Sequence, residues 1–278
     1  MAEDYRQASL AIWDQMAAGW EADRRSVWKS SRVVAEWLVD ALDPQPGETI
    51  LELAAGVGDT GIAAASRLGP SGTLISTDFS AQMVDASRRR AEELDASNVE
   101  VRTMNAERMD LADDSVDGVL CRWGYMLMAD PAAALAETRR VLRPGGRVAF
   151  SVWANPASNR WASVPAEALL EHMRAEPPDP HAPGIFAMAS EERTRALLSA
   201  AHLEPSRMEY VEMEWAFESP DDHWHYVMDL AGAIAMVLRS LPESEQAAIR
   251  RLSEERLEPV ASRPGYGLPG LCLNVLAA

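Results

Sequence analysis

The chain has 278 residues, of which 47% are hydrophobic, so it can bury a substantial core and disorder is not expected. Its formal net charge of −17 argues against a nucleic acid or an anionic membrane as partner, because phosphate binding needs clustered Lys and Arg. The two cysteines form no C-x-x-C pair, so neither a disulfide framework nor a zinc site is indicated, and a reducing cytoplasm is expected. Neither a basic-then-apolar leader nor an apolar run of about 18 residues is present, so we expect no membrane insertion and a small-molecule partner.

Two helices are predicted ahead of the first strand. Residues 4–23 carry apolar side chains at helical spacing, and a second helix is predicted over residues 30–42, before the run D-P-Q-P-G ends it. We assign residues 1–44 to a lid or cap, because helices that precede a doubly wound sheet can close over its ligand-binding edge. Trp13 and Trp20 are candidate substrate contacts in this segment, and packing in the core is the alternative.

Residues 49–61 predict a strand, a tight turn and the start of a helix. Their sequence is T-I-L-E-L-A-A-G-V-G-D-T-G, in which a short apolar run precedes Gly56 and Gly58. Glycine lets the backbone adopt positive φ and lets a ligand press against the main chain, while unpaired N–H groups of the next helix face the same space. This arrangement indicates a nucleotide-like ligand, although glycine pairs also occur in ordinary turns between a strand and a helix.

A second predicted strand, residues 73–77, leads into Asp78, about 20 residues beyond the glycines. A carboxylate at this offset accepts hydrogen bonds from ribose hydroxyls, so the ligand is expected to carry a ribose. A dinucleotide fold is expected to show G-x-G-x-x-G, whereas we interpret the spacing here as E-x-A-x-G-x-G, with Glu52 closing the strand and Ala54 in place of a first glycine. This segment resembles motif I of class I S-adenosylmethionine-dependent methyltransferases.

The chain continues as strands and helices joined by short connections, which predicts a parallel sheet. Strands are predicted over residues 99–103, 116–121 and 147–153, and a helix over residues 131–142. The runs N-A-E after the third strand, D-S-V-D before the fourth and R-V-L-R-P-G-G before the fifth accompany them. Together with the glycines and Asp78, these runs resemble the successive signatures of small-molecule methyltransferases of the ubiquinone and menaquinone type, over about residues 45 to 155.

The resemblance implies an α/β fold with a Rossmann-like, doubly wound, seven-stranded and mostly parallel sheet, an antiparallel last strand and helical cap insertions. Beyond the fifth strand, helices are predicted over residues 161–174, 190–201, 222–239 and 243–258, and strands over residues 207–217 and 271–276. We divide the rest of the chain into an S-adenosylmethionine-binding core (45–153), a cap insertion (154–189), a core helix and strand (190–218), a helical cap insertion (219–262) and a final strand (263–278). Trp161 and Trp224 of the insertions are candidate substrate contacts, and packing in a core is again the alternative.

The resemblance also implies S-adenosylmethionine as the cofactor. Glu52 and the backbone of residues 54–58 are expected to hold its methionine portion, and Asp78 its ribose hydroxyls. Cys121 and Arg122 end the fourth strand, where family members commonly present a carbonyl to the methionine ammonium. We interpret Cys121 itself as a buried small side chain rather than a nucleophile, because nothing in its surroundings indicates a lowered pKa.

The adenine is expected to lie against residues that follow the second and third strands. Phe79 and Met83 could pack on its face, Asn105 could accept a hydrogen bond from its amino group, and Ala106 could offer a backbone N–H. The predicted cofactor contacts are Glu52, Ala54, Ala55, Gly56, Gly58, Asp78, Phe79, Met83, Asn105, Ala106, Cys121 and Arg122.

Methyl transfer is an in-line displacement that depends on positioning more than on reactive side chains. Candidates for a base are Tyr125, His223 and His225, with surface or capping roles as the alternative for the histidines. Trp123 also follows the fourth strand and is a candidate substrate contact. The run H-W-H invites a metal site, but residues two apart on a helix do not share a face, so no metal is predicted.

We therefore predict an S-adenosylmethionine-dependent methyltransferase that acts on a small, largely apolar or aromatic acceptor. Two alternatives remain. One is an NAD-dependent oxidoreductase, against which we count the absence of a third glycine at the G-x-G-x-x-G position. The other is a non-catalytic S-adenosylmethionine-binding protein. The acceptor, the methylated atom and the formation of a homodimer are left open.

Overall fold

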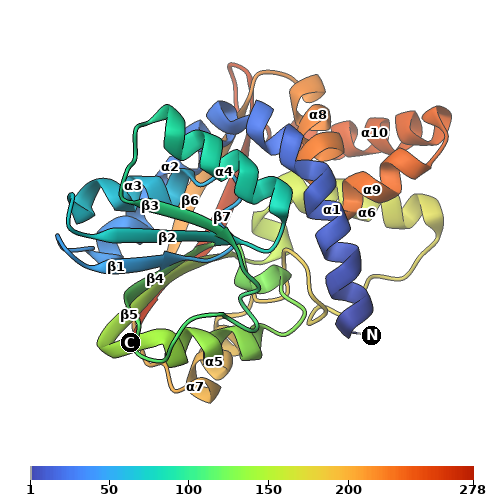
Figure 1. The fold of residues 1–278 in the computed structure, drawn as a ribbon. Coiled ribbons are helices and arrows are strands. Elements are labelled where there is room, and N and C mark those ends of the chain that lie inside the picture. Colours follow the sequence, from blue (N-terminus) through green and yellow to red (C-terminus); the bar gives the residue numbers. More distant parts are fainter. Residues whose placement is uncertain (1) are drawn as a thin grey trace.

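The computed structural model describes residues 2–278, through which a seven-stranded mixed sheet runs (Figure 1). The strands are β1 (Thr49–Glu52), β2 (Thr73–Asp78), β3 (Val99–Thr103), β4 (Val116–Arg122), β5 (Leu142–Trp153), β6 (Pro205–Phe217) and β7 (Tyr266–Ala277). Their order across the sheet is β3-β2-β1-β4-β5-β7-β6. The five strands from β3 to β5 are parallel, and β7 runs antiparallel to both β5 and β6. This confirms the predicted mostly parallel sheet with an antiparallel last strand.

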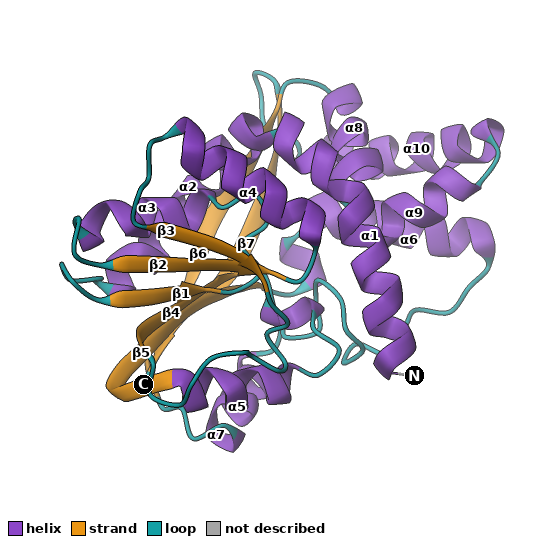
Figure 2. Cartoon of the chain, in the orientation of Figure 1, coloured by secondary structure: helices purple, strands orange, loops and turns teal. Residues whose placement is uncertain are grey.

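Helices cover both faces of the sheet (Figure 2). They are α1 (Ala2–Ala22), α2 (Arg24–Leu42), α3 (Asp59–Leu68), α4 (Ala81–Glu93), α5 (Pro131–Val141), α6 (Arg160–Met173), α7 (Glu191–Ala200), α8 (Pro220–Leu230), α9 (Ala233–Ser240) and α10 (Glu243–Leu257), with short 3-10 turns η1 (Tyr125–Leu127), η2 (Pro156–Ser158) and η3 (Glu258–Val260). One face carries α2, α3 and α4, and the opposite face carries α5 and α7. The fold is therefore a three-layer α/β arrangement with extra helices at one end.

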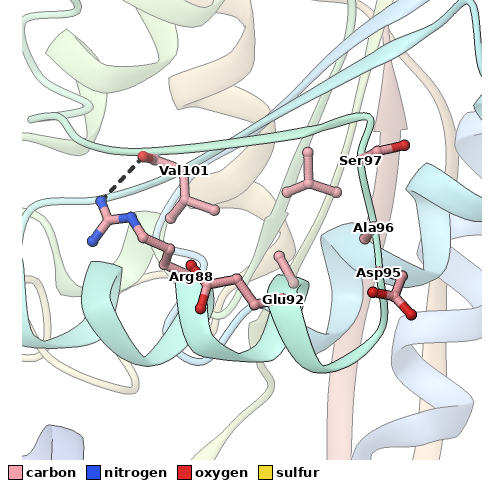
Figure 3. Close-up of a pocket in the computed structure, with 8 residues that line it drawn as sticks. Arg88, Glu92, Asp95, Ala96, Ser97 and Val101 are labelled. Atoms are coloured by element: carbon pink, nitrogen blue, oxygen red, sulfur yellow. Dashed lines mark hydrogen bonds between the residues drawn. The ribbon is translucent and has the colours of Figure 1, made fainter.

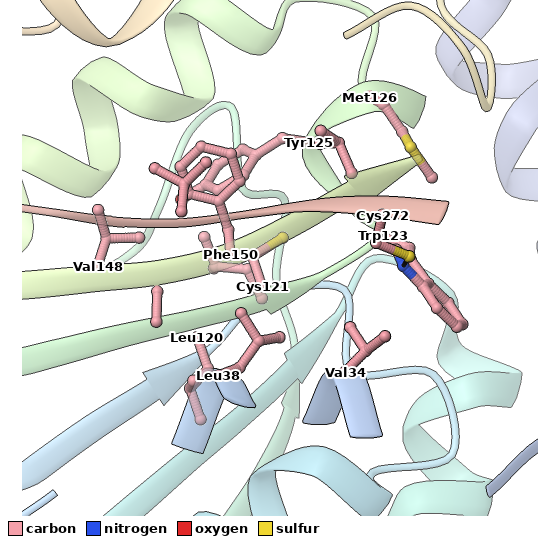
Figure 4. Packing of buried hydrophobic residues seen from close by; sticks show 14 of the residues in the cluster. Val34, Leu38, Leu120, Cys121, Trp123, Tyr125, Met126, Val148, Phe150 and Cys272 are labelled. Carbon is pink, nitrogen blue, oxygen red and sulfur yellow. Dashed lines mark hydrogen bonds between the residues drawn. The ribbon is translucent and has the colours of Figure 1, made fainter. Parts of the chain in front are cut away.

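The N-terminal helices divide differently from the prediction. Helix α2 begins at Arg24 rather than at residue 30, and its apolar side packs on β4, β5, β6 and β7. Figure 4 shows Val34 and Leu38 of α2 on one side of the sheet and Tyr125 and Phe150 on the other. Helix α2 thus belongs to the core layer, because its buried stripe matches a sheet face, and α1 alone remains as a candidate lid.

The two predicted cap insertions pack against each other. Helix α6 of the first contacts α10 and α8 of the second, and together they enclose a small apolar cluster separate from the main core. The second insertion contains two helices where one was predicted over residues 222–239, because the chain turns at Gly232 with φ of 57°. Helices α6, α8, α9 and α10 lie together at the right of Figure 1 as one cap.

Strands β5 and β7 begin earlier than predicted. Leu142 already pairs with Val116 of β4, and the register then shifts before Arg147 pairs with Gly118. Strand β7 begins at Tyr266, since its first residues pair with the end of β6. Strands β6 and β7 therefore extend beyond the end of β5 and form a wall beside the carboxyl edge of the parallel strands.

Candidate active site

The turn after β1 has the left-handed backbone that its glycines indicate. Gly56 has φ of 56° and Gly58 has φ of 86°, and Ala54 also adopts positive φ, at 50°. A Cβ built on Gly58 would collide with Ser87 of α4, whereas one built on Gly56 meets no atom within 4 Å. Gly58 is therefore required for packing, and the space in front of Gly56 is open to a ligand.

Asp78 links this turn to α4. Its Oδ2 accepts a hydrogen bond from the Gly56 N–H at 2.9 Å, and its Oδ1 accepts one from the Ser80 N–H at 2.9 Å. Burial raises the pKa of the carboxyl to about 6, although these backbone hydrogen bonds favour the ionised form. The Phe79 N–H also contributes a hydrogen bond, and a carboxylate offers about four acceptor sites, so Asp78 at the end of β2 can still accept a further hydrogen bond.

Glu52 lies beneath the turn. Its carboxylate accepts hydrogen bonds from the Gly61 N–H at 2.6 Å and from the Ser76 hydroxyl at 2.8 Å, and the residue is 3% exposed. Burial raises its pKa to about 8, because loss of water disfavours the ionised form. The side chain thus points at the first turn of α3, where it ties β1, β2 and α3 together.

Helix α1 packs against the same turn. Asp14 of α1 accepts a hydrogen bond from the Ser80 hydroxyl at 2.6 Å. Trp13 and Trp20 pack on an apolar cluster formed by α1, the turn and α4, whose buried members are Ala17, Val57, Met83 and Ala86. Near its start, α1 reaches η1 through the Tyr5 hydroxyl, which donates to the Leu127 carbonyl at 2.9 Å. The N-terminal helix therefore covers the glycine turn, in the place predicted for a lid.

The four residues predicted at the adenine occupy different environments. Phe79 is half-buried, and Met83 is buried beneath α1. Asn105 is exposed, and its Oδ1 accepts the Glu107 N–H at 2.9 Å, while Ala106 is buried. The Asn105 oxygen predicted to face the adenine amino group thus closes a local turn in this structure.

The end of β4 places a guanidinium beside the turn. Arg122 Nε donates to Thr60 Oγ1 of α3 at 2.8 Å, and its Cζ lies 4.5 Å from the centre of the Trp123 ring. Cys121, on the opposite face, is fully buried, and burial raises its pKa to about 12. Cys121 is therefore buried, as predicted, and its burial disfavours the thiolate.

Aromatic side chains gather beyond the ends of β4 and β5. The rings of Trp123 and Trp153 stack with centres 4.3 Å apart, and Trp153 meets Trp161 at 4.8 Å. Trp215 of β6 lies 5.0 Å from Trp161 and 4.7 Å from Tyr226 of α8. Trp153, Trp215 and Tyr226 were not among the candidates, because they come from strands and a helix whose register the sequence does not show.

The three candidate bases are not brought together. The Tyr125 hydroxyl is fully buried and lies 2.6 Å from Thr138 Oγ1 of α5. His223 is buried against the Trp161 carbonyl at 2.8 Å, and burial lowers its pKa to about 4. His225 projects into solvent from the same helix, with Nε2 3.8 Å from Asp229. The candidate contact Trp224 packs in the separate apolar cluster of the cap.

A surface groove lies away from these residues (Figure 3). It is lined by the end of α4 and by β3, with Arg88 donating to the Val101 carbonyl at 3.4 Å. None of the predicted site residues lines it. Among residues 2–278, no helix is long and apolar enough to cross a membrane.

Curated relatives align with only part of this chain. A demethylmenaquinone methyltransferase from Listeria welshimeri is 33% identical over 120 residues, which are 43% of this chain and 51% of that protein. An arsenite methyltransferase from Halobacterium salinarum is 39% identical over 106 residues, 38% of this chain and 27% of that protein. A nocamycin O-methyltransferase from Saccharothrix syringae is 32% identical over 155 residues, 55% of this chain and 54% of that protein. The chain thus spans about half or less of the length of these relatives.

Solved structures share the fold at low sequence identity. An S-adenosylmethionine-dependent methyltransferase from Aquifex aeolicus has a TM-score of 0.52 and 19% identity, covering 68% of this chain and 90% of that one. A structure described as a [4+2]-cyclase has a TM-score of 0.56 and 17% identity, covering 88% of this chain and 78% of that one. A family model described as a methyltransferase domain matches residues 44–232, more than half of the sequence. The chain therefore belongs to the methyltransferase domain family, as its resemblance to class I S-adenosylmethionine-dependent methyltransferases implied.

Proposed function

We propose that this protein is an S-adenosylmethionine-dependent methyltransferase that acts on a small, largely apolar or aromatic acceptor. The observation that carries the proposal is the bond between the buried Asp78 carboxylate and the Gly56 N–H, inside a domain that matches the methyltransferase family. This bond supports the proposal because it holds a carboxylate, suited to accept from ribose hydroxyls, beside a turn whose main chain is open to a ligand.

The residues present fit the cofactor. A Cβ at Gly56 would stand in empty space, so the main chain there can approach the methionine portion closely. Asp78 keeps acceptor capacity for a ribose hydroxyl, and Phe79 is half-buried beside it. The backbone of residues 54–58 and the end of β4 would hold the methionine portion, with Arg122 at the end of that strand.

Bound S-adenosylmethionine supplies an activated methyl group on a positively charged sulfur. What the protein contributes is alignment of the acceptor with that methyl group and exclusion of water, which together account for most of the rate in such a displacement. The aromatic cluster beyond β4 and β5 gives an apolar boundary on one side. Helix α1 covers the glycine turn on the other side of the proposed site, through the packing of Trp13 and Trp20.

The acceptor class rests on this aromatic boundary. The relatives named above act, by their names, on arsenite, demethylmenaquinone and nocamycin, so the family alone does not choose among chemically different acceptors. A largely apolar or aromatic acceptor is favoured because Trp123, Trp153 and Trp215 gather next to the end of β4.

A nicotinamide-dependent oxidoreductase remains the second candidate, and the glycines do not exclude it. Contrary to our expectation, Gly56, Gly58 and Gly61 do fit the spacing G-x-G-x-x-G. A Cβ at Gly61 would collide with the Glu52 carboxylate, so this third glycine serves close packing of helix on strand, as in dinucleotide folds. The family match is what favours methyl transfer.

Calorimetric titration of the purified protein with S-adenosylhomocysteine and with NAD separates the two enzymes. We expect binding of S-adenosylhomocysteine and none of NAD, and the reverse result would replace the proposal. Incubation with methyl-labelled S-adenosylmethionine and a panel of small aromatic acceptors then tests turnover. Cofactor binding without label transfer across the panel would favour a non-catalytic binding protein.

A further inference from the structure

Three buried polar side chains form a row across the sheet next to the aromatic cluster, and the row continues to exposed Glu209 of β6, which lies opposite Asn274 and accepts from Trp37. Arg122 of β4 pairs with Ser151 of β5, and Ser151 pairs with Asn274 of β7. Residues directly opposite one another on neighbouring strands point to the same face, so the three side chains are neighbours. Because Arg122 bonds Thr60 of α3, this face is the one that α2 and α3 cover. We name Arg122, Ser151 and Asn274 the polar row.

The side chains of the polar row are largely buried, and several of their polar atoms have no hydrogen-bond partner in the described chain. Asn274 is 0% exposed, and neither its Oδ1 nor its Nδ2 has a hydrogen-bond partner within residues 2–278. Ser151 is also 0% exposed, and in the described chain its hydroxyl meets only the weakly bonding Cys272 thiol. Arg122 Nη1 is enclosed and lacks a partner in the same part of the chain. Buried polar groups in folded proteins nearly always have partners, so this concentration of exceptions indicates a bound group.

The charge of Arg122 indicates what that group is. Across the described residues, no carboxylate forms an ion pair with this guanidinium. Glu52 is near enough to interact electrostatically, but it is buried and bonded to Gly61 and Ser76 instead. A largely buried guanidinium with a free N–H and no counter-ion is suited to an anionic oxygen ligand, which it can meet with two parallel hydrogen bonds.

The surroundings of the row indicate the rest of the ligand. Trp123 lies against the Arg122 guanidinium, and its Nε1 donates to Cys272 Sγ, at 3.3 Å, on the strand that carries Asn274. Trp153 stacks on Trp123, so flat apolar surface adjoins the polar row at the carboxyl edge of the sheet. A molecule that satisfies both parts has an aromatic body and a charged end.

We propose that the polar row binds the carboxylate of a flat aromatic acceptor. This inference rests on the proposed function and adds to it that the acceptor is an aromatic acid. The cofactor also carries a carboxylate, but Ser151 and Asn274 lie on β5 and β7, on the side of Arg122 away from the glycine turn. The position of the row therefore favours the carboxylate of the acceptor over that of the cofactor as its ligand.

The test uses 2-naphthoate and its neutral counterpart 2-naphthamide as probes, titrated into the full chain with and without saturating S-adenosylhomocysteine. We expect 2-naphthoate to bind at least tenfold more tightly than 2-naphthamide. Asn274→Leu and Arg122→Gln should each abolish this preference. Asn274→Leu exchanges an unpartnered amide for an apolar side chain of similar size, so it should fold even if Arg122→Gln does not.

Arg102→Gln is the matched control. Arg102 on β3 also has a buried nitrogen, Nε, without a partner among the residues described, but it lies at the opposite edge of the sheet. This variant should keep the preference for 2-naphthoate.

Equal affinity for the two probes in the wild type, or an unchanged preference in Asn274→Leu, would overturn the inference. Weaker binding of S-adenosylhomocysteine in Arg122→Gln and Asn274→Leu, with an unchanged probe preference, would assign the row to the cofactor carboxylate. A wild type that prefers 2-naphthoate but binds no S-adenosylhomocysteine would contradict the proposed function and leave the anion site standing.

Discussion

The two halves of the carboxyl edge of the sheet differ in how their polar side chains are satisfied. At the ends of β1 and β2, the buried carboxylates of Glu52 and Asp78 accept hydrogen bonds from the main chain of the turn, α3 and α4. At β4, β5 and β7, the polar row lies buried beside tryptophans with polar atoms that the rest of residues 2–278 leaves without partners. In the first half both carboxylates already have hydrogen-bond partners, and Asp78 can accept more, whereas in the second half several buried polar atoms have no partner in the described part of the chain.

This difference corresponds to two tasks, holding a cofactor and selecting an acceptor. A turn that holds a nucleotide must present fixed main-chain groups, so its side chains are committed to holding that main chain. A site for an acceptor must discriminate by shape and charge, so its polar groups stay free until the ligand arrives. We therefore expect substitutions in the first half to affect cofactor binding and those in the second half to affect stability or the acceptor.

The largest expected effect comes from the aromatic cluster. Trp161 is 4% exposed and contacts Trp153, Trp215 and Tyr226, so Trp161→Ala should destabilise the protein by about 3 to 5 kcal/mol. Thermal unfolding measures this. Trp224→Ala is the control, because Trp224 is only partly buried in the cap cluster, and it should lower the melting temperature much less.

If both variants kept their stability while only acceptor turnover fell, Trp161 would serve the acceptor and not the core. Equal losses of stability in the two variants would contradict the separation of the cap's own apolar cluster from the aromatic cluster.

A second comparison concerns the ribose site. Asp78→Asn removes a charged acceptor, so S-adenosylhomocysteine should bind more weakly by about 1.5 to 3 kcal/mol in a folded protein. Burial raises the pKa of Asp78 from 3.8 to about 6, and the ribose hydroxyls donate to the ionised form. Affinity of the wild type should therefore fall as the pH drops through about 6, while the Asn variant should show no such change.

The raised pKa of Asp78 also makes folding stability depend on pH, in the direction opposite to that of cofactor affinity. The folded state holds this proton more tightly than the unfolded state, so the contribution of Asp78 to stability is greatest at low pH and declines as the pH rises from about 4 to about 6. Asp78→Asn should remove that decline from the pH profile of denaturant unfolding. A profile identical to that of the wild type would mean that Asp78 titrates at its ordinary pKa.

Two glycine substitutions separate packing from ligand contact. Gly58→Ala brings a methyl group against Ser87 and should destabilise the fold, by more than the roughly 1 to 2 kcal/mol that a left-handed alanine costs. Gly56→Ala has that backbone cost without a clash, so its melting temperature should fall less. Its affinity for S-adenosylhomocysteine should nevertheless fall, because the methyl group projects into the space assigned to the ligand. Unchanged affinity in Gly56→Ala would place the cofactor elsewhere.

The smallest expected effect concerns the lid. Asp14→Ala removes the hydrogen bond from the Ser80 hydroxyl but leaves Ser80 to cap α4, so global stability should change by less than about 1 kcal/mol. Amide hydrogen exchange in α1 should increase, since α1 loses a tie to α4. If exchange in α1 stayed at the wild-type rate, packing of Trp13 and Trp20 alone would hold the helix.

The first half of the edge could be predicted from the sequence because the residues that build it lie close together in the chain. The strand, the glycines and Asp78 fall within residues 49–78, and their roles follow from backbone conformation and spacing. The direction of the Glu52 side chain was not accessible, since a residue that ends a strand can point to either face.

The second half depends on register between distant segments. Arg122, Ser151 and Asn274 become neighbours only through the pairing of β5 with β4 and β7, and β7 lies more than 100 residues from β5 in sequence. Composition and periodicity predicted an apolar cap, but they could not show that Tyr226 would meet Trp215. Nor could they show that the Tyr125 hydroxyl faces α5.

A structure of the protein with S-adenosylhomocysteine tests the central claim most directly. We predict ribose hydroxyls within hydrogen-bond distance of the Asp78 carboxylate, the methionine portion on the backbone of residues 54–58, and the sulfur facing the end of β4 at Trp123. A ribose bound away from Asp78, or a methionine portion that leaves the space before Gly56 empty, would contradict it.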